Sequence, residues 1–74
     1  MGNKHMFGQR LRAARVEKGL TREKFAHAVG VDPPCAYRWE SGRNYPRTEK
    51  LIEISRELGV SIDWLVGVDA EDNA

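Results

Sequence analysis

Basic side chains gather in the first part of this 74-residue chain. Up to Arg47 there are ten Lys and Arg residues against four acids, a net charge of +6, whereas from Thr48 onward two basic residues stand against seven acids, a net charge of −5. Ammonium and guanidinium groups bind anions such as phosphate. The first part therefore suits a polyanionic partner, and the acidic part should face away from it. The alternative is that these charges are scattered over a solvated surface.

The residues that could bind a metal or catalyse a reaction form no known motif. His5, His27 and Cys35 lie on different segments and lack the paired spacing of zinc ligands. The sequence contains no phosphate-binding loop and no Gly-x-Ser-x-Gly motif, and its one cysteine has no evident base partner. We therefore expect no enzyme activity, no metal, no cofactor and no small-molecule ligand.

The composition is that of a small globular domain, with 41% hydrophobic and 31% charged residues. A single cysteine allows no internal disulfide, which fits a reducing compartment. The apolar runs are far shorter than the roughly 20 residues that span a bilayer, and the first residues lack the apolar segment of a signal peptide. We expect one cytoplasmic domain without membrane contact.

Hydrophobic spacing and helix-terminating residues predict an all-α fold, a compact five-helix domain over residues 6–67. A flexible N-terminus (1–5) should precede this domain, and an acidic tail (68–74) should follow it. The first two helices are predicted at 6–18 and 22–29, and the third between Asp32 and Ser41. We expect Thr48 to cap the fourth helix and Ser61 to cap the last, at 62–66. A glycine follows each helix, at positions 19, 30, 42, 59 and 67.

Only Gly30, Val31 and Asp32 separate the second helix from the third. A short turn that contains glycine forces two helices to cross steeply, which is the geometry of a helix-turn-helix. In such a unit the second helix enters the major groove of DNA while the first lies across the backbone.

The residues from Leu20 to Pro46 make this interpretation specific. Three stretches and one proline closely resemble the phage repressor and Cro (XRE-like) family of helix-turn-helix regulators. They are Leu20-Thr21-Arg22-Glu23-Lys24-Phe25-Ala26, Gly30-Val31-Asp32, Tyr37-Arg38-Trp39-Glu40-Ser41-Gly42-Arg43 and Pro46. The segment 51–65 is similar to the last two helices of that family, so the resemblance covers about 7–67. It implies a lambda-repressor-like fold and a sequence-specific DNA-binding regulator of transcription, such as a repressor, encoded by a bacterium or phage and located at the nucleoid.

The resemblance also implies roles for single residues. Arg15 and Glu40 match an ion pair that joins the first helix to the end of the third. Arg38 matches a base-contacting position, where a guanidinium can donate to guanine. Four further residues match contacts to the DNA backbone, which fix the register without reading sequence. These phosphate-contacting residues are Arg22, Arg43, Asn44 and Arg47.

Pro33 and Pro34 depart from the family, which usually has polar, base-reading side chains at these positions. Because proline disfavours the helical conformation in the residue before it, we expect the third helix to begin near Pro34. Pro34 can then offer only apolar contact, for example to a thymine methyl group. Base contacts should move to Tyr37 and Arg38, and also to Cys35. The alternatives are that Tyr37 packs over the prolines and that Cys35 is a small, half-buried side chain.

One recognition helix reads few bases, so we expect a homodimer on a palindromic operator in double-stranded DNA. The candidate dimer surface comprises Trp64, Val66 and Val68, although Trp64 could instead cover the core. The alternative function is a protein–protein interaction module on the same scaffold. Such a module would not need basic residues at positions 22, 43 and 47, and it would lack the steep salt dependence of DNA binding.

Overall fold

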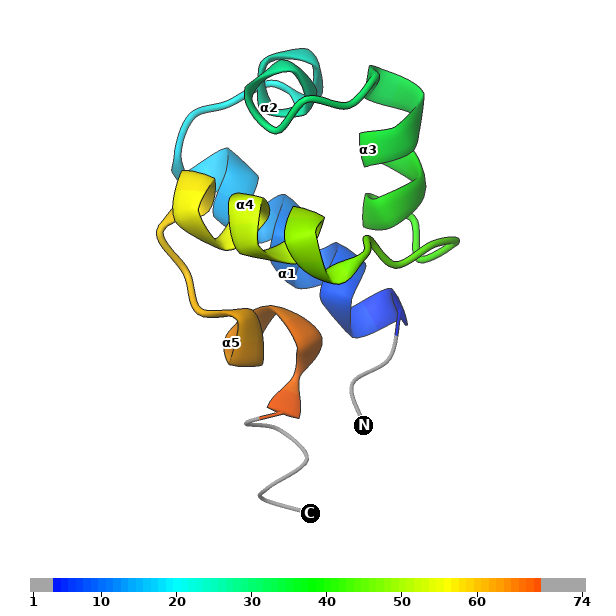
Figure 1. Ribbon diagram of the computed structural model, residues 1–74, viewed down its shortest axis with the longest axis vertical. Coiled ribbons are helices and arrows are strands. Elements are labelled where there is room, and N and C mark those ends of the chain that lie inside the picture. The colour runs from blue at the N-terminus through cyan, green and yellow to red at the C-terminus, as the bar shows by residue number, and fades with distance from the viewer. Residues whose placement is uncertain (1–3, 69–74) are drawn as a thin grey trace.

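The computed structural model describes residues 4–68, in which five α-helices and no strand are found (Figure 1). The helices are α1 (Lys4–Glu17), α2 (Arg22–Ala28), α3 (Pro33–Glu40), α4 (Thr48–Leu58) and α5 (Ile62–Val66). This architecture confirms the all-α prediction with five helices. Residues 1–3 of the predicted flexible N-terminus and residues 69–74 of the predicted acidic tail lie outside the described residues.

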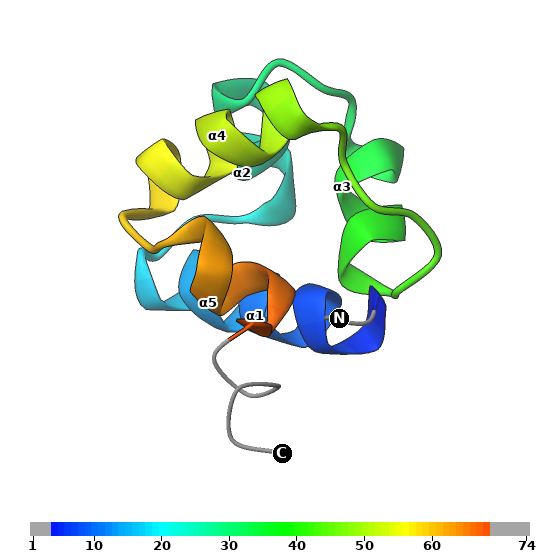
Figure 2. The same ribbon diagram turned by 60° about the horizontal axis from the view of Figure 1, so that its bottom comes forward.

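The first and third helices each pack against two of the other helices. α1 contacts both α3 and α5, α2 contacts α3, and α4 contacts α5. Figure 2 shows α5 beside α1, with α4 on the other side of the molecule. The core between the helices is built around five large side chains that are fully buried. These are Phe7, Leu11, Phe25, Ile54 and Leu65.

The observed helix boundaries differ from the predicted ones in three helices besides α3. α1 begins at Lys4 and ends at Glu17, so that it starts two residues earlier than predicted. α2 ends at Ala28, and Val29 is its C-cap. The prediction that Thr48 caps α4 was wrong. Arg47 has the extended backbone of an N-cap, and its carbonyl accepts the amide of Leu51 at 2.9 Å, so Thr48 is already helical.

The prediction that α3 begins near Pro34 was also wrong by one residue, because the helix begins at Pro33. The extended backbone that Pro33 demands of its predecessor falls on Asp32, which is the N-cap (ψ 156°). The Asp32 side chain accepts the Cys35 amide at 3.2 Å. The two prolines occupy the first two helical positions, where backbone amides have no acceptor within the helix, so their missing N–H groups cost the helix little.

All five helices within residues 4–68 are too short or too polar to cross a lipid bilayer.

Candidate nucleic-acid interface

The turn between α2 and α3 directs the two helices in clearly different directions (Figure 1). Gly30 adopts a left-handed conformation (φ 74°), and the Val31 amide donates to the Ala26 carbonyl at 2.9 Å. Val31 is half-buried and packs against the core, which ties the turn to the domain. The next residue, Asp32, is the N-cap of α3. This is the local geometry that the short glycine-containing turn predicts.

The two sides of α3 differ sharply in exposure. Ala36 and Trp39 are buried in the core. Four of the other residues face solvent and form what we call the outer face of α3. These are Pro33, Pro34, Tyr37 and Arg38. The predicted base-contacting residues Pro34, Tyr37 and Arg38 therefore lie together on one exposed surface, whereas Cys35 is half-buried.

Arg15 and Glu40 lie in contact at the junction of α1 and α3. Arg15 Nε donates to Glu40 Oε2 at 2.6 Å, and the two side chains are only 9% and 4% exposed. Arg15 also donates to the Leu20 carbonyl at 2.7 Å. A carboxylate buried to this degree needs such partners to offset the loss of its hydration. The pair therefore joins the end of α3 to α1.

Glu40 also accepts a hydrogen bond from a second arginine. Arg22 Nε lies 3.3 Å from Glu40 Oε1, and the Arg22 side chain is 41% exposed. The Arg22 guanidinium carbon lies 5.1 Å from the centroid of the Tyr37 ring, in cation–π geometry. This contact was not predicted from the sequence, because Arg22 and Tyr37 lie on two different helices and were assigned separate roles.

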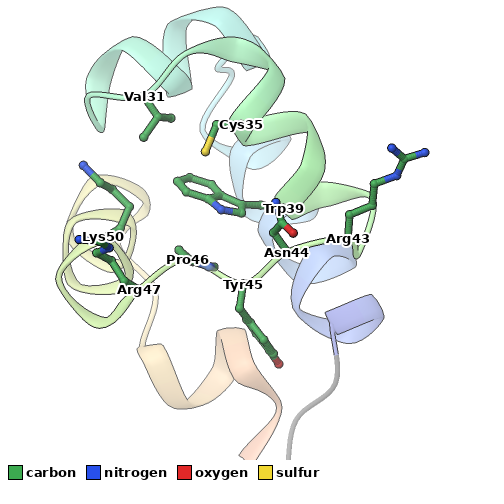
Figure 3. A pocket seen from close by; sticks show the side chains of 9 residues that line it. All are labelled: Val31, Cys35, Trp39, Arg43, Asn44, Tyr45, Pro46, Arg47 and Lys50. Carbon is green, nitrogen blue, oxygen red and sulfur yellow. The ribbon is translucent and has the colours of Figure 1, made fainter.

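A pocket of about 410 Å³ separates α3 from the N-terminal part of α4 (Figure 3). Val31, Cys35 and Trp39 form one wall, and Arg47 and Lys50 stand on the side of α4. The remaining lining comes from the segment between the two helices, namely Arg43, Asn44, Tyr45 and Pro46. Three of the four predicted phosphate-contacting residues, Arg43, Asn44 and Arg47, thus border one pocket beside α3. Arg22 lies on α2 and is not among them.

Lys50 and Tyr45 fix the walls of this pocket. Lys50 Nζ donates to the Val29 carbonyl at 2.6 Å and to Glu53 Oε1 at 2.7 Å, so α4 is tied to the end of α2. The Tyr45 ring lies 5.2 Å from the Phe7 ring, next to the buried Pro46. Burial raises the pKa of the Tyr45 phenol above its ordinary value of 10.0.

The three residues of the candidate dimer surface differ in exposure. Trp64 is half-buried against the core, with the Arg10 guanidinium carbon 5.1 Å from its ring centroid. Arg10 also donates to the Trp64 carbonyl, so α1 holds the end of α5. Val66 packs partly against the core as well, whereas Val68 is 37% exposed. Core contact thus accounts for part of the Trp64 and Val66 surfaces, and Val68 is the most accessible of the three.

The short turn between α2 and α3, together with an exposed outer face on α3, defines a helix-turn-helix domain. The sequence model of the helix-turn-helix family matches residues 11–65, and this chain belongs to that family. The resemblance predicted from the residues is thereby confirmed.

Two curated relatives illustrate the similarity. The chain is 38% identical over 60 residues to the HTH-type transcriptional activator BcrR of Enterococcus faecalis, an alignment that covers 81% of this chain and 29% of the activator. It is 34% identical over 68 residues to the cryptic phage CTXphi transcriptional repressor RstR of Vibrio cholerae, with 92% of this chain and 60% of the repressor covered. The chain thus spans less than two thirds of the length of either relative.

Two solved structures share the fold at similar identity. The P22 c2 repressor, solved with the synthetic operator 9T, superimposes with a TM-score of 0.80 at 30% identity, covering 82% of this chain and 92% of that one. SinR, the master regulator for biofilm formation, was solved in complex with DNA. It gives a TM-score of 0.75 at 31% identity, with 81% and 97% covered.

Proposed function

We propose that this chain is a sequence-specific, DNA-binding regulator of transcription that places α3 in the major groove of duplex DNA. The observation that carries this proposal is the outer face of α3, which arginines flank on both sides. Arg22 lies on the α2 side, whereas Arg43 and Arg47 border the pocket on the α4 side. A helix about 10–12 Å across fits the major groove, and flanking cations then reach the phosphates on either side of it.

The residues of the outer face divide into those that read bases and those that position the helix. We assign Arg38, which is exposed, to donate to guanine, and the exposed neighbour Tyr37 to offer its hydroxyl group to a base edge. Pro34 offers apolar contact to a thymine methyl group. Cys35 follows it in the first turn of α3. The proposed phosphate contacts come from Arg22, Arg43, Asn44 and Arg47. Because three of these border the pocket between α3 and α4, we place one strand of the DNA backbone across that pocket.

The relatives support this proposal. The P22 c2 repressor is described in complex with a synthetic operator and SinR in complex with DNA, and both share this fold over most of their own chains. BcrR and RstR are described as transcriptional regulators. We propose that this chain, like them, acts on transcription, without an enzyme activity of its own, and that it works in the cytoplasm where bacterial and phage DNA lies.

We further propose that the chain binds as a homodimer. One α3 reads only a few base pairs, and two copies related by a two-fold axis would read two half-sites about one helical turn apart. The exposed Val68 and the accessible parts of Trp64 and Val66 form the candidate contact between the copies. A palindromic operator would follow from that symmetry.

The salt dependence of DNA affinity tests the proposed function. Affinity for random and operator duplexes should fall steeply with salt, because each neutralised phosphate releases condensed counterions and adds about 0.9 to the magnitude of the slope of log K against log salt. Replacing Arg43 and Arg47 together by Gln should make the slope less steep by about 2 for each bound subunit. Arg56→Gln, in the last turn of α4, is the matched control and should leave the slope unchanged.

The protein–protein module makes the opposite prediction. If the protein retards no duplex at low salt, the proposed function is wrong and the alternative is favoured. If it binds DNA but the Arg43/Arg47 double variant keeps the slope of the parent protein, the assignment of these phosphate contacts is wrong.

A further inference from the structure

We propose that Arg22 orients the Tyr37 side chain, and that Tyr37 is thereby a specificity-determining residue of the outer face of α3. This inference rests on the proposed function and deepens it, since it states how one base contact is prepared before DNA binds. The family resemblance alone assigned a phosphate contact to Arg22 and left two roles open for Tyr37. The geometry between α2 and α3 joins the two residues.

The first step is that Glu40 holds the Nε edge of the Arg22 guanidinium group. Its Nε lies 3.3 Å from Glu40 Oε1, and the Glu40 side chain is only 4% exposed. Glu40 is itself fixed, because Arg15 Nε donates to its other oxygen at 2.6 Å. A guanidinium group is a rigid, planar fork, so fixing one edge restricts the plane of the whole group. Its remaining N–H groups can still donate to a phosphate.

The second step is that the guanidinium carbon of Arg22 lies over the Tyr37 ring. The distance of 5.1 Å between the guanidinium carbon and the ring centroid is within the range of cation–π contacts. Tyr37 is 49% exposed, and a side chain so exposed would ordinarily sample several rotamers. The contact with Arg22 favours one of them. Less side-chain entropy is then lost when Tyr37 meets the DNA, which increases affinity for the matching sequence.

The third step concerns the hydroxyl group of Tyr37. Within residues 4–68, no hydrogen bond to this hydroxyl is found, so it is available both to donate and to accept. Pro33 and Pro34, the other half of the outer face, have no polar side-chain atoms and no backbone N–H. The polar groups that this face offers to base edges therefore come from Tyr37 and Arg38. A hydroxyl held in one place discriminates between bases better than a mobile one.

These steps predict that the effects of Arg22 and Tyr37 on specificity are coupled. An operator is first selected with the parent protein from a pool of random duplexes. Dissociation constants for this operator and for a scrambled duplex are then measured by fluorescence anisotropy for the parent protein, Arg22→Lys, Tyr37→Phe and the double variant. Arg22→Lys keeps the charge for the phosphate but lacks the planar fork, and Tyr37→Phe keeps the ring but lacks the hydroxyl. Arg56→Lys, at an exposed position of α4 outside the proposed DNA contacts, is the matched control.

We expect each single variant to lower the ratio of scrambled to operator dissociation constants about fivefold or more, as loss of one base contact does. Affinity for the scrambled duplex should change less than about twofold, because phosphate contacts are retained. The double variant should resemble Tyr37→Phe alone, and Arg56→Lys should leave the ratio unchanged. Thermal melting of every variant establishes that the fold is intact, as expected for side chains as exposed as Arg22 and Tyr37.

Three results would overturn the inference. An unchanged ratio in Tyr37→Phe would show that the hydroxyl reads no base. Effects that multiply in the double variant, to about 25-fold, would show that Arg22 and Tyr37 act independently. An equal loss in Arg56→Lys would show that any Arg to Lys change has this effect. If the parent protein binds neither duplex, the proposed function itself has failed, which is a distinct outcome.

Discussion

Gly8 on α1 lies so close to Glu40 on α3 that a Cβ atom added to it would stand 2.4 Å from the Glu40 carbonyl oxygen. The same atom would lie 2.8 Å from the carbonyl oxygen of Trp39. Both neighbours are backbone atoms, which cannot rotate away as a side chain would. Glu40 also binds Arg15 and Arg22 through its carboxylate. The close crossing of α1 and α3 at Gly8 therefore sets the position of α3 and of its outer face relative to α1.

Gly8→Ala should destabilise the protein. In an unobstructed helix, alanine is more favourable than glycine by about 0.5–1 kcal/mol. Here we expect the free energy of unfolding to fall by about 1–3 kcal/mol, because α1 and α3 must move apart to admit the methyl group. Urea unfolding followed by circular dichroism measures the change. Gln9→Ala, at the exposed neighbouring position, is the control and should change stability little. A Gly8→Ala protein as stable as the parent would contradict the observed packing.

Glu40→Ala should lower stability much more than an exposed substitution does. Removal of Glu40 leaves the buried Arg15 guanidinium without its partner, and such a loss costs about 3–5 kcal/mol. Glu53→Ala removes an ion pair with Lys50 in which Glu53 is 51% exposed, so it should cost no more than about 1 kcal/mol. Thermal and urea unfolding of both variants allow the comparison. Equal effects at the two positions would mean that burial of the Arg15–Glu40 pair does not matter for stability.

Stability should fall in alkaline solution, in part because of Tyr45. Burial raises the pKa of its phenol above 10.0, so the folded protein keeps this proton to a higher pH than the unfolded chain does. Above about pH 10 the unfolded state binds fewer protons than the folded state does. The free energy of unfolding then decreases as the pH rises. Tyr45→Phe should show a smaller decrease over that range.

Tyr37→Phe provides the direct measurement of this pKa, since it leaves Tyr45 as the only tyrosine in the sequence. The absorbance of the tyrosinate in this variant should titrate with a midpoint above 10.0. A midpoint at or below 10.0 would contradict the partial burial of the Tyr45 side chain, which is 37% exposed.

Val68→Glu should weaken the proposed homodimer. A carboxylate at this accessible apolar position would meet its symmetry-related copy across a two-fold axis, or would lose its hydration in the contact. We expect the dimer dissociation constant, measured by sedimentation equilibrium, to rise about tenfold or more, an effect of about 1.4 kcal/mol. Val16→Glu is the matched control, because Val16 is 58% exposed on α1. A parent protein that stays monomeric at tens of micromolar with operator present would contradict the dimer.

The fold could be predicted well from local signals, because most of them act within one helix. The spacing of Phe7, Leu11 and Ala14 predicted the buried face of α1, and all three are buried. Ser61 caps α5 as predicted, by accepting the Trp64 amide. The start of α1 was misplaced by two residues, and the ends of α1 and α2 by one residue each. The starts of α4 and α3 were also misplaced by one residue each, where the backbone conformations of Arg47 and Asp32 define the helix starts. Those conformations depend on Pro46, Pro33 and the packed loops around them.

The candidate site was less predictable, since its important contacts join distant parts of the chain. The sequence indicated which residues are basic, but the cation–π contact between Arg22 and Tyr37 requires the relative placement of α2 and α3. The importance of Gly8 was missed for the same reason, because a glycine within a helix gives no local sign of a close backbone neighbour. Likewise, no local pattern showed that Arg43 and Arg47 border one pocket with Lys50.

The two prolines at the start of α3 also affect the chain before it folds. Each ring restricts the backbone of the unfolded polypeptide, and a proline at a compatible position stabilises a protein by about 0.4–1 kcal/mol for this reason. Both prolines stand where helix amides would find no internal acceptor, and Asp32, which precedes Pro33, has the extended backbone that a following proline favours. The helix that presents the outer face thus begins with less conformational freedom to lose, and this entropic gain accompanies the loss of two hydrogen-bond donors from the surface.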